Sequence, residues 1–462
     1  MRPTGAPCKL YTPHTARDIE EMLDAVGAKS LEELTRVPDE VALKSELEVV
    51  PALPESAILR RFESFAARNE ASECISFLGA GAYRHYCPPA VMALAMRGEF
   101  LTSYTPYQAE VSQGYLQAIY EWQTYIALLT GLNVANASVY DGATALAEGV
   151  IMAIHANGRK KVLVSRAVHP NYRAVLKTYA DGLDLTVDEL PLSLHGTSDW
   201  SDLGTAAACA DYAAIVVQSP NFFGNIESPP AAASSAIAES GAVLIAVVAE
   251  ALSLAALRTP ASWGAQIAVG DAQSFGVPVA YGGPYVGFIA AAKEHLRRIP
   301  GRLVGKTLDN RGQEAYVLTL QAREQHIRRE RATSNICTNQ AHCALIATMY
   351  LALLGQGGLR DCAAENLRRS RELATRVSSV PGCALCFDAP FFNEFVLKLP
   401  VAAKGLLQQL AGMGILAGVD LGRWYPEYSN SILMTATELT TSEDIDALCA
   451  ALGKALRVAT SV

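Results

Sequence analysis

The stretch Val243-Leu-Ile-Ala-Val-Val248 is a continuous run of six apolar residues, most of them β-branched. A run of this kind is typical of a strand that is buried on both faces of a sheet. Runs with the same texture occur at Val162–Ser165, Ile215–Gln218 and Ile267–Gly270. Because helical patterns separate them, they predict βαβ units, a mainly parallel sheet and right-handed crossovers. Ligands bind such sheets beyond the carboxyl ends of the strands, so functional residues are expected in the loops that follow these runs.

The sequence changes character on both sides of this α/β region. Residues 1–60 resemble a helical arm, in which Thr15 and Asp18 form a capping-box pattern, a helix ends at Gly27, and Ser30 and Glu33 repeat the cap. Such an arm has too little core to stand alone, so we expect its apolar stripe to lie on the main body or on a partner. The last part of the chain mixes a long helix with short strands, at Ala341–Leu354, Glu394–Leu399, Ala402–Met413 and Ile432–Thr435. We therefore predict an arm over 1–60, a large α/β domain over 61–345 and a small C-terminal α+β domain over 346–462.

Composition excludes several classes of function. The 462 residues are 50% hydrophobic, and 38 basic against 46 acidic residues give a net charge of -8. Without a basic stripe, this balance argues against nucleic acid as the main partner. The longest apolar stretch, Ala242 to Leu257, contains Glu250 and is too short to span a bilayer. The amino terminus lacks the apolar core of a signal peptide. We therefore expect a cytoplasmic protein.

The cysteines also favour a cytoplasmic location. The ten cysteines are scattered, as expected of reduced thiols in a reducing compartment. The CxxC pair Cys383–Cys386 has no second pair and no nearby histidine, so ordinary buried thiols are the favoured interpretation and no metal site is expected.

Two polar loops are candidate binding segments. Residues 103–114 contain Tyr104, Thr105, Tyr107 and Gln108, and residues 77–86 combine small residues with His85 and its neighbours. Loops held on a rigid scaffold carry many functional groups. The simpler alternatives are a structural loop whose hydroxyls bond to the local backbone, and a tight turn at Gly79-Ala-Gly81 that lacks the third glycine of a dinucleotide fingerprint.

Three further segments leave alternatives open. At Tyr140–Glu148, free amides of residues 142–144 could hold an anion such as a cofactor phosphate, or Asp141 or Thr144 could simply cap a helix. The glycine-rich stretch 269–285 follows the last marked strand, at the expected ligand end. The mixed charges of Arg323–Arg331 are usual for a solvated face. The sequence contains no Gly-x-Ser-x-Gly elbow, P-loop or HExxH motif, which argues against several hydrolase, nucleotide-binding and zinc functions.

Several of these segments, in this order, resemble the glycine decarboxylase family, the P-protein of the glycine cleavage system. The resemblance extends over nearly the whole chain and is to the amino-terminal half of the long P-protein, which some members make separately as subunit 1. The motifs are YTPHTARDIEEML from Tyr11, FLGAGAYRHY from Phe77, SYTPYQAEVSQG from Ser103, TGLNVANASVYDGATA from Thr130, GDAQSFGVPVAYGGPYVGF from Gly270, PGRLVG from Pro300 and REQHIRRERATSNICTNQ from Arg323.

The resemblance implies an aspartate aminotransferase-like fold, which is fold type I of the pyridoxal phosphate (PLP) enzymes. It also implies a reaction in which glycine is decarboxylated, carbon dioxide is released and the aminomethyl group passes to the lipoyl arm of H-protein. That chemistry needs a lysine in Schiff-base linkage to PLP. The family's PLP-bearing half carries this lysine in a His-Lys-Thr-Phe segment, whereas this chain has Gln273-Ser-Phe-Gly276, with Ser274 at the lysine position.

A second departure concerns the acid that pairs with the PLP ring nitrogen, because the strand 243–248 leads into Ala249-Glu250 instead of the usual aspartate step. The chain therefore resembles the half without PLP, which pairs with a PLP-bearing subunit 2, as an expected heterotetramer of two of each chain. We expect Tyr104, Thr105, Tyr107, Gln108, His85 and Tyr86 to contribute to the active site at the contact with subunit 2.

Three alternatives stay open at this point. The chain could be an autonomous PLP enzyme with a displaced lysine, Lys293 or Lys306, although Lys306 is expected in a loop after a helix. It could be a scaffold or regulatory protein without catalysis. Cys337 could be a redox-sensitive thiol near the interface, or a buried packing residue.

Overall fold

The computed structural model describes residues 13–35, 37–43, 45 and 48–459. Tyr11, the first residue of the first family-like motif, lies outside the described residues. The chain divides into two compact units, Met1–Glu70 and Ala71–Val462. The predicted arm therefore falls within the first unit.

The first unit contains α1 (Ala16–Val26), α2 (Leu31–Leu34) and α3 (Glu55–Ala66). The predicted capping box is confirmed, because the Asp18 amide donates to Thr15 Oγ1 and the Thr15 amide donates to Asp18 Oδ2 at 2.6 Å. At α2, Ser30 caps as expected, but the Glu33 carboxylate accepts from the Lys29 amide instead of closing a second box on Ser30. None of the three helices contains a buried residue. The expectation that this apolar surface is covered elsewhere stays a prediction.

A seven-stranded sheet lies at the centre of the second unit, in the order β2-β8-β7-β6-β5-β3-β4. Strands β3 to β7 pair in parallel, whereas β8 runs antiparallel to both of its neighbours. The bounds are β2 Val134–Ala135, β3 Lys161–Ser165, β4 Thr186–Leu190, β5 Tyr212–Gln218, β6 Val243–Val248, β7 Ile267–Asp271 and β8 Gly287–Ala291. The four predicted runs are thus confirmed as four adjacent parallel strands. The other three were missed because β2 is two residues long, β4 is largely exposed and acidic, and β8 has only two large apolar residues, Phe288 and Ile289, among glycine and alanines.

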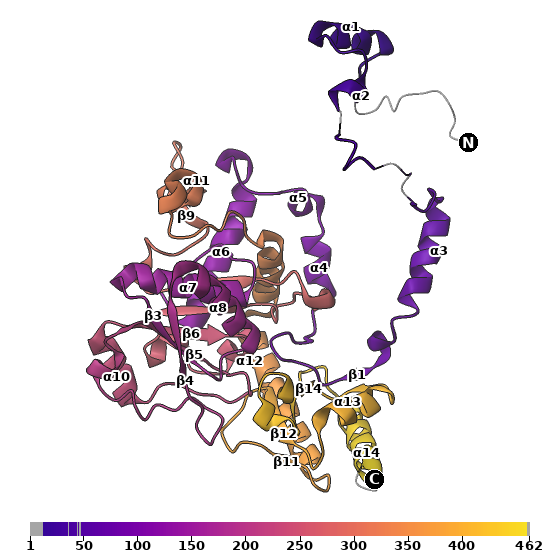
Figure 1. The fold of residues 1–462 in the computed structure, drawn as a ribbon. Helices are drawn as coiled ribbons and strands as arrows, with labels where there is room; N and C mark the ends of the chain where they lie inside the picture. The colour runs from indigo at the N-terminus through magenta and orange to yellow at the C-terminus, as the bar shows by residue number, and fades with distance from the viewer. Residues whose placement is uncertain (1–12, 36, 44, 46–47, 460–462) are drawn as a thin grey trace. The chain divides into compact units, whose positions relative to one another are not determined.

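Helices cover both faces of this sheet (Figure 1). One face packs on α7 (Gly142–Asn157) and α8 (Pro170–Leu183). The opposite face packs on α4 (Pro89–Ala95), α6 (Gln113–Thr130), α9 (Ala206–Cys209), α10 (Ala231–Ser240) and the first part of α12 (Ala341–Ser378). The side chains of β6 alternate between the two cores, since Val243, Ile245 and Val247 join the first and Ala246 and Val248 the second. Burial on both faces explains why this strand is apolar throughout.

Two smaller features leave the main sheet. An antiparallel hairpin joins β9 (Leu303–Leu308) to β10 (Glu314–Thr319), and short helices α5 (Gly98–Leu101) and α11 (Gln325–Arg328) lie in connections. Lys306 lies within β9, where its Nζ contacts Glu314 Oε1 at 2.5 Å, so the expectation that it lies in a loop is wrong. Its strand position arises because the segment after Pro300 pairs with β10.

The C-terminal region, orange to yellow in Figure 1, carries the expected helices and strands. A four-stranded antiparallel sheet has the order β11-β12-β15-β14. The elements are β11 Ala384–Leu385, β12 Glu394–Lys398, α13 Ala403–Ala411, β13 Ile415–Leu416, β14 Val419–Asp420, β15 Ser431–Thr435 and α14 Ser442–Ala459, with β13 paired to β1 Ile75–Ser76. Contacts place this region in the same unit as the large sheet, and its standing as a separate domain stays a prediction.

The long helix α12 connects the two regions. Gly355, at φ 59° and ψ -172°, interrupts its helical backbone. By length and composition alone α12 could cross a membrane, but half of its most apolar window is buried inside the fold, as in the core helix of a globular protein.

Candidate functional site

The carboxyl ends of β6 and β7 hold a set of buried polar side chains. Glu250 follows β6 by two residues, Asp271 is the last residue of β7, and Gln273 and Ser274 occupy the turn after it. All four are at most 3% exposed. This is the edge at which a parallel sheet presents its ligand site, so the arrangement of these groups decides what the site can hold.

The segment 77–86 enters this edge as a close-fitting backbone. The Tyr83 amide donates to Gln273 Oε1 at 2.9 Å, and Gln273 Nε2 donates back to the Tyr83 carbonyl at 3.0 Å. A Cβ on Gly79 would lie 2.0 Å from Thr435 Oγ1, and Gly81, at φ 95°, leaves room for His169. Only residues without a side chain allow such an approach. The tight-turn interpretation of Gly79-Ala-Gly81 is the one that the structure supports.

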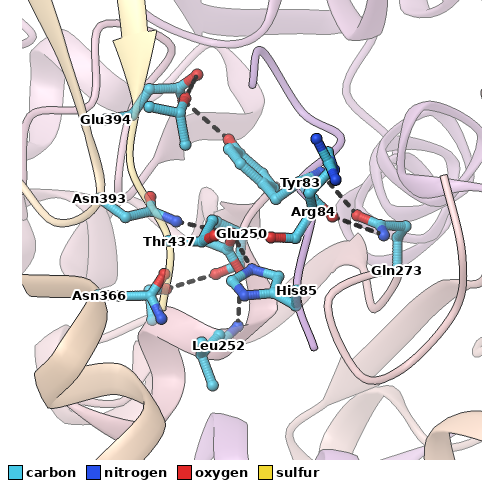
Figure 2. A network of polar contacts seen from close by, with 12 residues as sticks. Tyr83, Arg84, His85, Glu250, Leu252, Gln273, Asn366, Asn393, Glu394 and Thr437 are labelled. Carbon is cyan, nitrogen blue, oxygen red and sulfur yellow. Dashed lines mark hydrogen bonds and ion pairs between the residues drawn. The ribbon is translucent and has the colours of Figure 1, made fainter. Parts of the chain in front are cut away.

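His85 lies at the centre of the interior network drawn in Figure 2. Its Nε2 is 3.2 Å from Glu250 Oε2 and its Nδ1 is 2.9 Å from Glu438 Oε2, and its side chain is 2% exposed. Burial disfavours the charged ring, but the two carboxylates outweigh burial and raise the pKa of His85 to about 10. A ring that serves two carboxylates must donate from both nitrogens, so His85 is an imidazolium at neutral pH.

Amide donors complete the shells of both carboxylates. Glu250 accepts from the Leu252 amide at 2.9 Å and from Asn393 Nδ2 at 3.1 Å (Figure 2). Glu438 accepts from Asn366 Nδ2 at 2.8 Å and from the Tyr86 amide at 2.6 Å. Burial acts to raise the pKa of Glu438, but the His85 hydrogen bond and charge lower it to about 2.

A third carboxylate, Glu394 at the start of β12, lies on the other side of segment 77–86. It accepts from Tyr83 Oη at 2.9 Å, from the Ala80 amide at 2.6 Å and from Thr435 Oγ1 at 3.0 Å. Burial raises its pKa to about 7 despite these donors. The interior network therefore joins the large sheet to the C-terminal region through hydrogen bonds that are internal to the chain.

The amino terminus of α7, proposed above either to hold an anion or to carry a cap, is occupied by the chain's own carboxylates. Asp141 caps the helix by accepting from the Thr144 amide at 2.8 Å. Asp271 Oδ2 accepts from the Gly142 amide at 3.1 Å, and burial raises the pKa of Asp271 to about 6. The capping alternative is confirmed, and these two amides are already used.

These residues do not fit covalent binding of PLP. Ser274 is 1% exposed and offers a hydroxyl where an imine needs an amine. Glu250, which the resemblance predicts at the position of the ring-nitrogen acid, is already hydrogen-bonded to His85. The two lysines considered as substitutes lie elsewhere, since Lys293 is exposed in a short turn after β8 and Lys306 is in β9.

The structure places the six predicted site residues in two groups. Tyr104 and Tyr107 are 76% and 77% exposed, their ring centroids are 6.4 Å apart, and Gln108 beside them is also exposed while Thr105 is half-buried. His85 is inside the network, and Tyr86, attached to it through Glu438, is 54% exposed. Among the described residues, no hydrogen bond or ring contact joins the two groups.

Sequence reasoning missed the members of this network that come from the C-terminal region. Glu438 contacts His85 directly, Asn366 and Asn393 donate to the two carboxylates beside it, and Glu394 accepts from Tyr83. One signal was present, because Glu394 opens a segment predicted to be a strand of apolar residues, and a charged residue that is buried in a strand needs partners. Cys337 is an exposed free thiol, so the packing alternative for it is wrong, because its side chain points to solvent from a loop that is otherwise largely half-buried. Cys383 is buried and Cys386 half-buried, both as free thiols, and the described residues contain no cluster of three metal-binding side chains.

Comparisons with known proteins place this fold and sequence in one family. The sequence profile of the glycine cleavage system P-protein matches residues 9–452. A protein of Moorella thermoacetica described as probable glycine dehydrogenase (decarboxylating) subunit 1 is 49% identical over 443 residues, which are 96% of this chain and 98% of that protein.

Solved structures are similar to this chain in fold. The crystal structure of glycine decarboxylase (P-protein) of the glycine cleavage system, in inhibitor-bound form, is 46% identical, with a TM-score of 0.87 over 96% of this chain and 100% of that one. A C-DES variant with glycine covalently linked to its PLP cofactor is 16% identical, with a TM-score of 0.58 over 85% of this chain and 98% of that one. The second likeness concerns the fold alone, and it confirms the expected fold type I architecture.

Proposed function

Because this chain belongs to the glycine cleavage system P-protein family, we propose that it acts as subunit 1 of glycine dehydrogenase (decarboxylating) and completes a catalytic site whose PLP is carried by a partner chain, subunit 2. In this proposal the assembled enzyme releases the glycine carboxylate as carbon dioxide. The aminomethyl carbon forms a bond to one lipoyl sulfur of H-protein, while the lipoyl disulfide is reduced. The lipoyl group is thus a co-substrate and not a resident cofactor.

One observation carries the proposal that PLP resides on subunit 2. The sheet edge that would hold a cofactor is filled by the interior network around His85, and Ser274 replaces the amine at the end of β7. A buried imidazolium with two buried carboxylates is expensive to take apart, because removing one partner leaves an uncompensated charge. In this proposal the chain therefore positions groups at the shared site and supplies contact surface for subunit 2, and it does not form a Schiff base with PLP.

The contact with subunit 2 is proposed to involve the exposed aromatic side chains of the predicted site. Tyr104, Tyr107 and Tyr86 present large amphipathic rings to solvent, and Tyr residues are enriched in protein interfaces. Thr105 and Gln108 accompany them, and His85 holds the Tyr86 segment through their shared carboxylate, Glu438. A heterotetramer of two chains of each kind is the assembly we propose.

Visible absorbance tests the location of PLP. The purified chain and subunit 2 are each incubated with PLP and measured before and after borohydride reduction. We expect a reducible imine band only in subunit 2. A band in this chain alone would point to an autonomous enzyme and overturn the proposal.

Exchange of labelled bicarbonate into glycine by the assembled enzyme tests the catalytic role. The mixture should be active and subunit 2 alone should not; turnover by subunit 2 alone would favour a scaffold. Replacing both Tyr104 and Tyr107 by Ala should lower the exchange rate at least tenfold. The matched control is Leu194→Ala, a truncation at a side chain that is 96% exposed, and it should leave the rate unchanged.

A further inference from the structure

A cavity of about 730 Å³ lies between α7, α8 and the segment 330–336, on the face of the molecule formed by those helices. Its volume is within the range of small-molecule binding pockets. None of the interior-network residues around His85 lines it, so the proposed function does not account for it. Glu148, in the middle of α7, is the lining residue that calls for an explanation.

The Glu148 carboxyl group is buried without a complete set of partners. The residue is 3% exposed, and its Oε2 is a buried oxygen with no hydrogen-bond partner. Burial raises the pKa of Glu148 to about 7, and hydrogen bonding by Ser334 offsets this only in part. Buried carboxylates are normally paired, because an unpaired buried charge costs several kcal/mol. A buried polar group without a partner calls for an explanation, and a ligand or ion that binds beside it is one.

The charged neighbours of the cavity do not supply the missing cation. Lys160 lines it, but its Nζ contacts Asp184 Oδ2 at 3.4 Å and its side chain is 65% exposed. His155 is exposed, and Glu330 is a second carboxylate, 79% exposed and 3.8 Å from Arg331. Within the described lining, Glu148 is thus a buried negative group and the remaining charges lie in solvent.

The walls of the cavity are mixed, with polar side chains such as Thr178, Tyr179 and Ser334 beside an apolar part. The apolar part consists of aliphatic side chains from α7, from the end of α8 and the residues after it, and from segment 330–336, namely Ile151, Ile154, Leu183, Leu185 and Ile336. One buried carboxylate, with the second carboxylate Glu330 exposed in solvent, is a poor metal site, since hard cations need several oxygen ligands. A hydrocarbon chain that ends in a positive charge matches both features.

We propose that this cavity binds an organic cation, an ammonium or guanidinium group on an alkyl stem, with Glu148 as its counter-ion. The stem lies against the aliphatic part of the walls and the charged head donates to the free carboxylate oxygen. Two sources offer this chemistry, a free alkylamine and a lysine or arginine side chain of subunit 2. Binding of a small cation to the isolated chain does not depend on the proposed function, so the two can fail separately.

Calorimetric titration of the full chain with butylammonium at pH 8 tests the proposal, with 1-butanol as the uncharged probe of similar shape. Butylammonium should bind at least tenfold more tightly than butanol, which is the lower end of the contribution of a desolvated charge pair. Glu148→Gln should remove this preference. Equal binding of the two probes by the unchanged chain would overturn the proposal, whether or not the variant folds.

The matched control is Glu330→Gln, which neutralises the exposed carboxylate of the same cavity. It should change butylammonium binding less than twofold, and an effect as large as that of Glu148→Gln would contradict the assignment of Glu148. A second titration, on the chain mixed with subunit 2, separates the sources. If a side chain of subunit 2 fills the cavity, butylammonium no longer binds and Glu148→Gln weakens subunit association; if the ligand is a free amine, binding persists in the complex.

Discussion

The imidazolium of His85 should give this protein a stability that declines at alkaline pH. In the folded chain its pKa is about 10, against 6.5 for an unperturbed histidine, because Glu250 and Glu438 outweigh the opposing effect of burial. A raised pKa stabilises the fold fully below pH 6.5, and this contribution is lost as the pH rises toward 10. Its maximum is about 5 kcal/mol, at 1.36 kcal/mol for each pH unit between the two values. The contribution is close to this maximum at pH 6 and falls to about a third of it at pH 9.

The variant that isolates this effect replaces His85 and Glu438 together, each by Gln. The double change removes the pair and leaves Glu250 with its amide donors, Leu252 and Asn393. Urea unfolding followed by circular dichroism gives the free energy of unfolding of both proteins at pH 6 and pH 9. The advantage of the unchanged chain should shrink by about 3 kcal/mol between the two pH values.

The matched control is an exposed pair of the same type, His195 and Asp388, whose Nδ1 and Oδ1 are 2.6 Å apart with both side chains more than 60% exposed. Replacing them by Gln and Asn should leave the pH dependence of unfolding unchanged, because exposed pairs contribute little. The reasoning is refuted if the advantage over the double Gln variant is the same at pH 6 and pH 9. Other groups that titrate in this range cancel in the difference.

Three further outcomes are expected. Gly276→Ala should destabilise the chain by about 1–3 kcal/mol more than Gly158→Ala. Both glycines have φ near 77°, but a Cβ at Gly276 would lie 2.8 Å from the Tyr350 ring, whereas a Cβ at Gly158 would have no atom within 4 Å. Equal midpoints of thermal unfolding for the two variants would contradict this prediction. Ser274→Lys alone should give no borohydride-reducible PLP band, since the surrounding groups stay bonded to one another, and a stable band would show the site to be adaptable. Thr15→Ala should cost about 1 kcal/mol of local helix stability, seen as faster amide hydrogen exchange in α1 without a change in the rest of the chain.

The sequence predicts those parts of the fold whose signals are local. The run Val243–Val248 is apolar throughout because both of its faces are covered, and Thr15 with Asp18 closes a cap within four residues. Strand β4 could not be found in this way, since its pattern is mostly exposed and acidic, and it is held at the sheet edge by pairing with β3. Tertiary pairing overrides local propensity in such strands.

The site was only partly predictable for a similar reason. Ser274 and Glu250 follow strand ends, and their departure from the family pattern was visible in the sequence. The partner of His85, Glu438, lies 353 residues away along the chain, and no local spacing connects the two. Even the exposed pair Tyr104 and Tyr107 was grouped with His85 by composition, whereas the fold gives them different surroundings.

The loops at the carboxyl ends of parallel strands expose backbone amides that need hydrogen-bond acceptors. In this chain its own carboxylates are those acceptors. Asp271 takes the amides of Gly142 and Gln273, and Glu250 takes the amide of Leu252 and the charge of His85. Each carboxylate thus accepts the hydrogen bonds that a bound anion would otherwise accept at this edge of the sheet. A lysine at position 274 would therefore enter a site whose other contacts are already made, and a cofactor would have to displace buried, mutually bonded charges. The cost of that displacement supports the proposal that the PLP of the assembled enzyme is carried by a second chain.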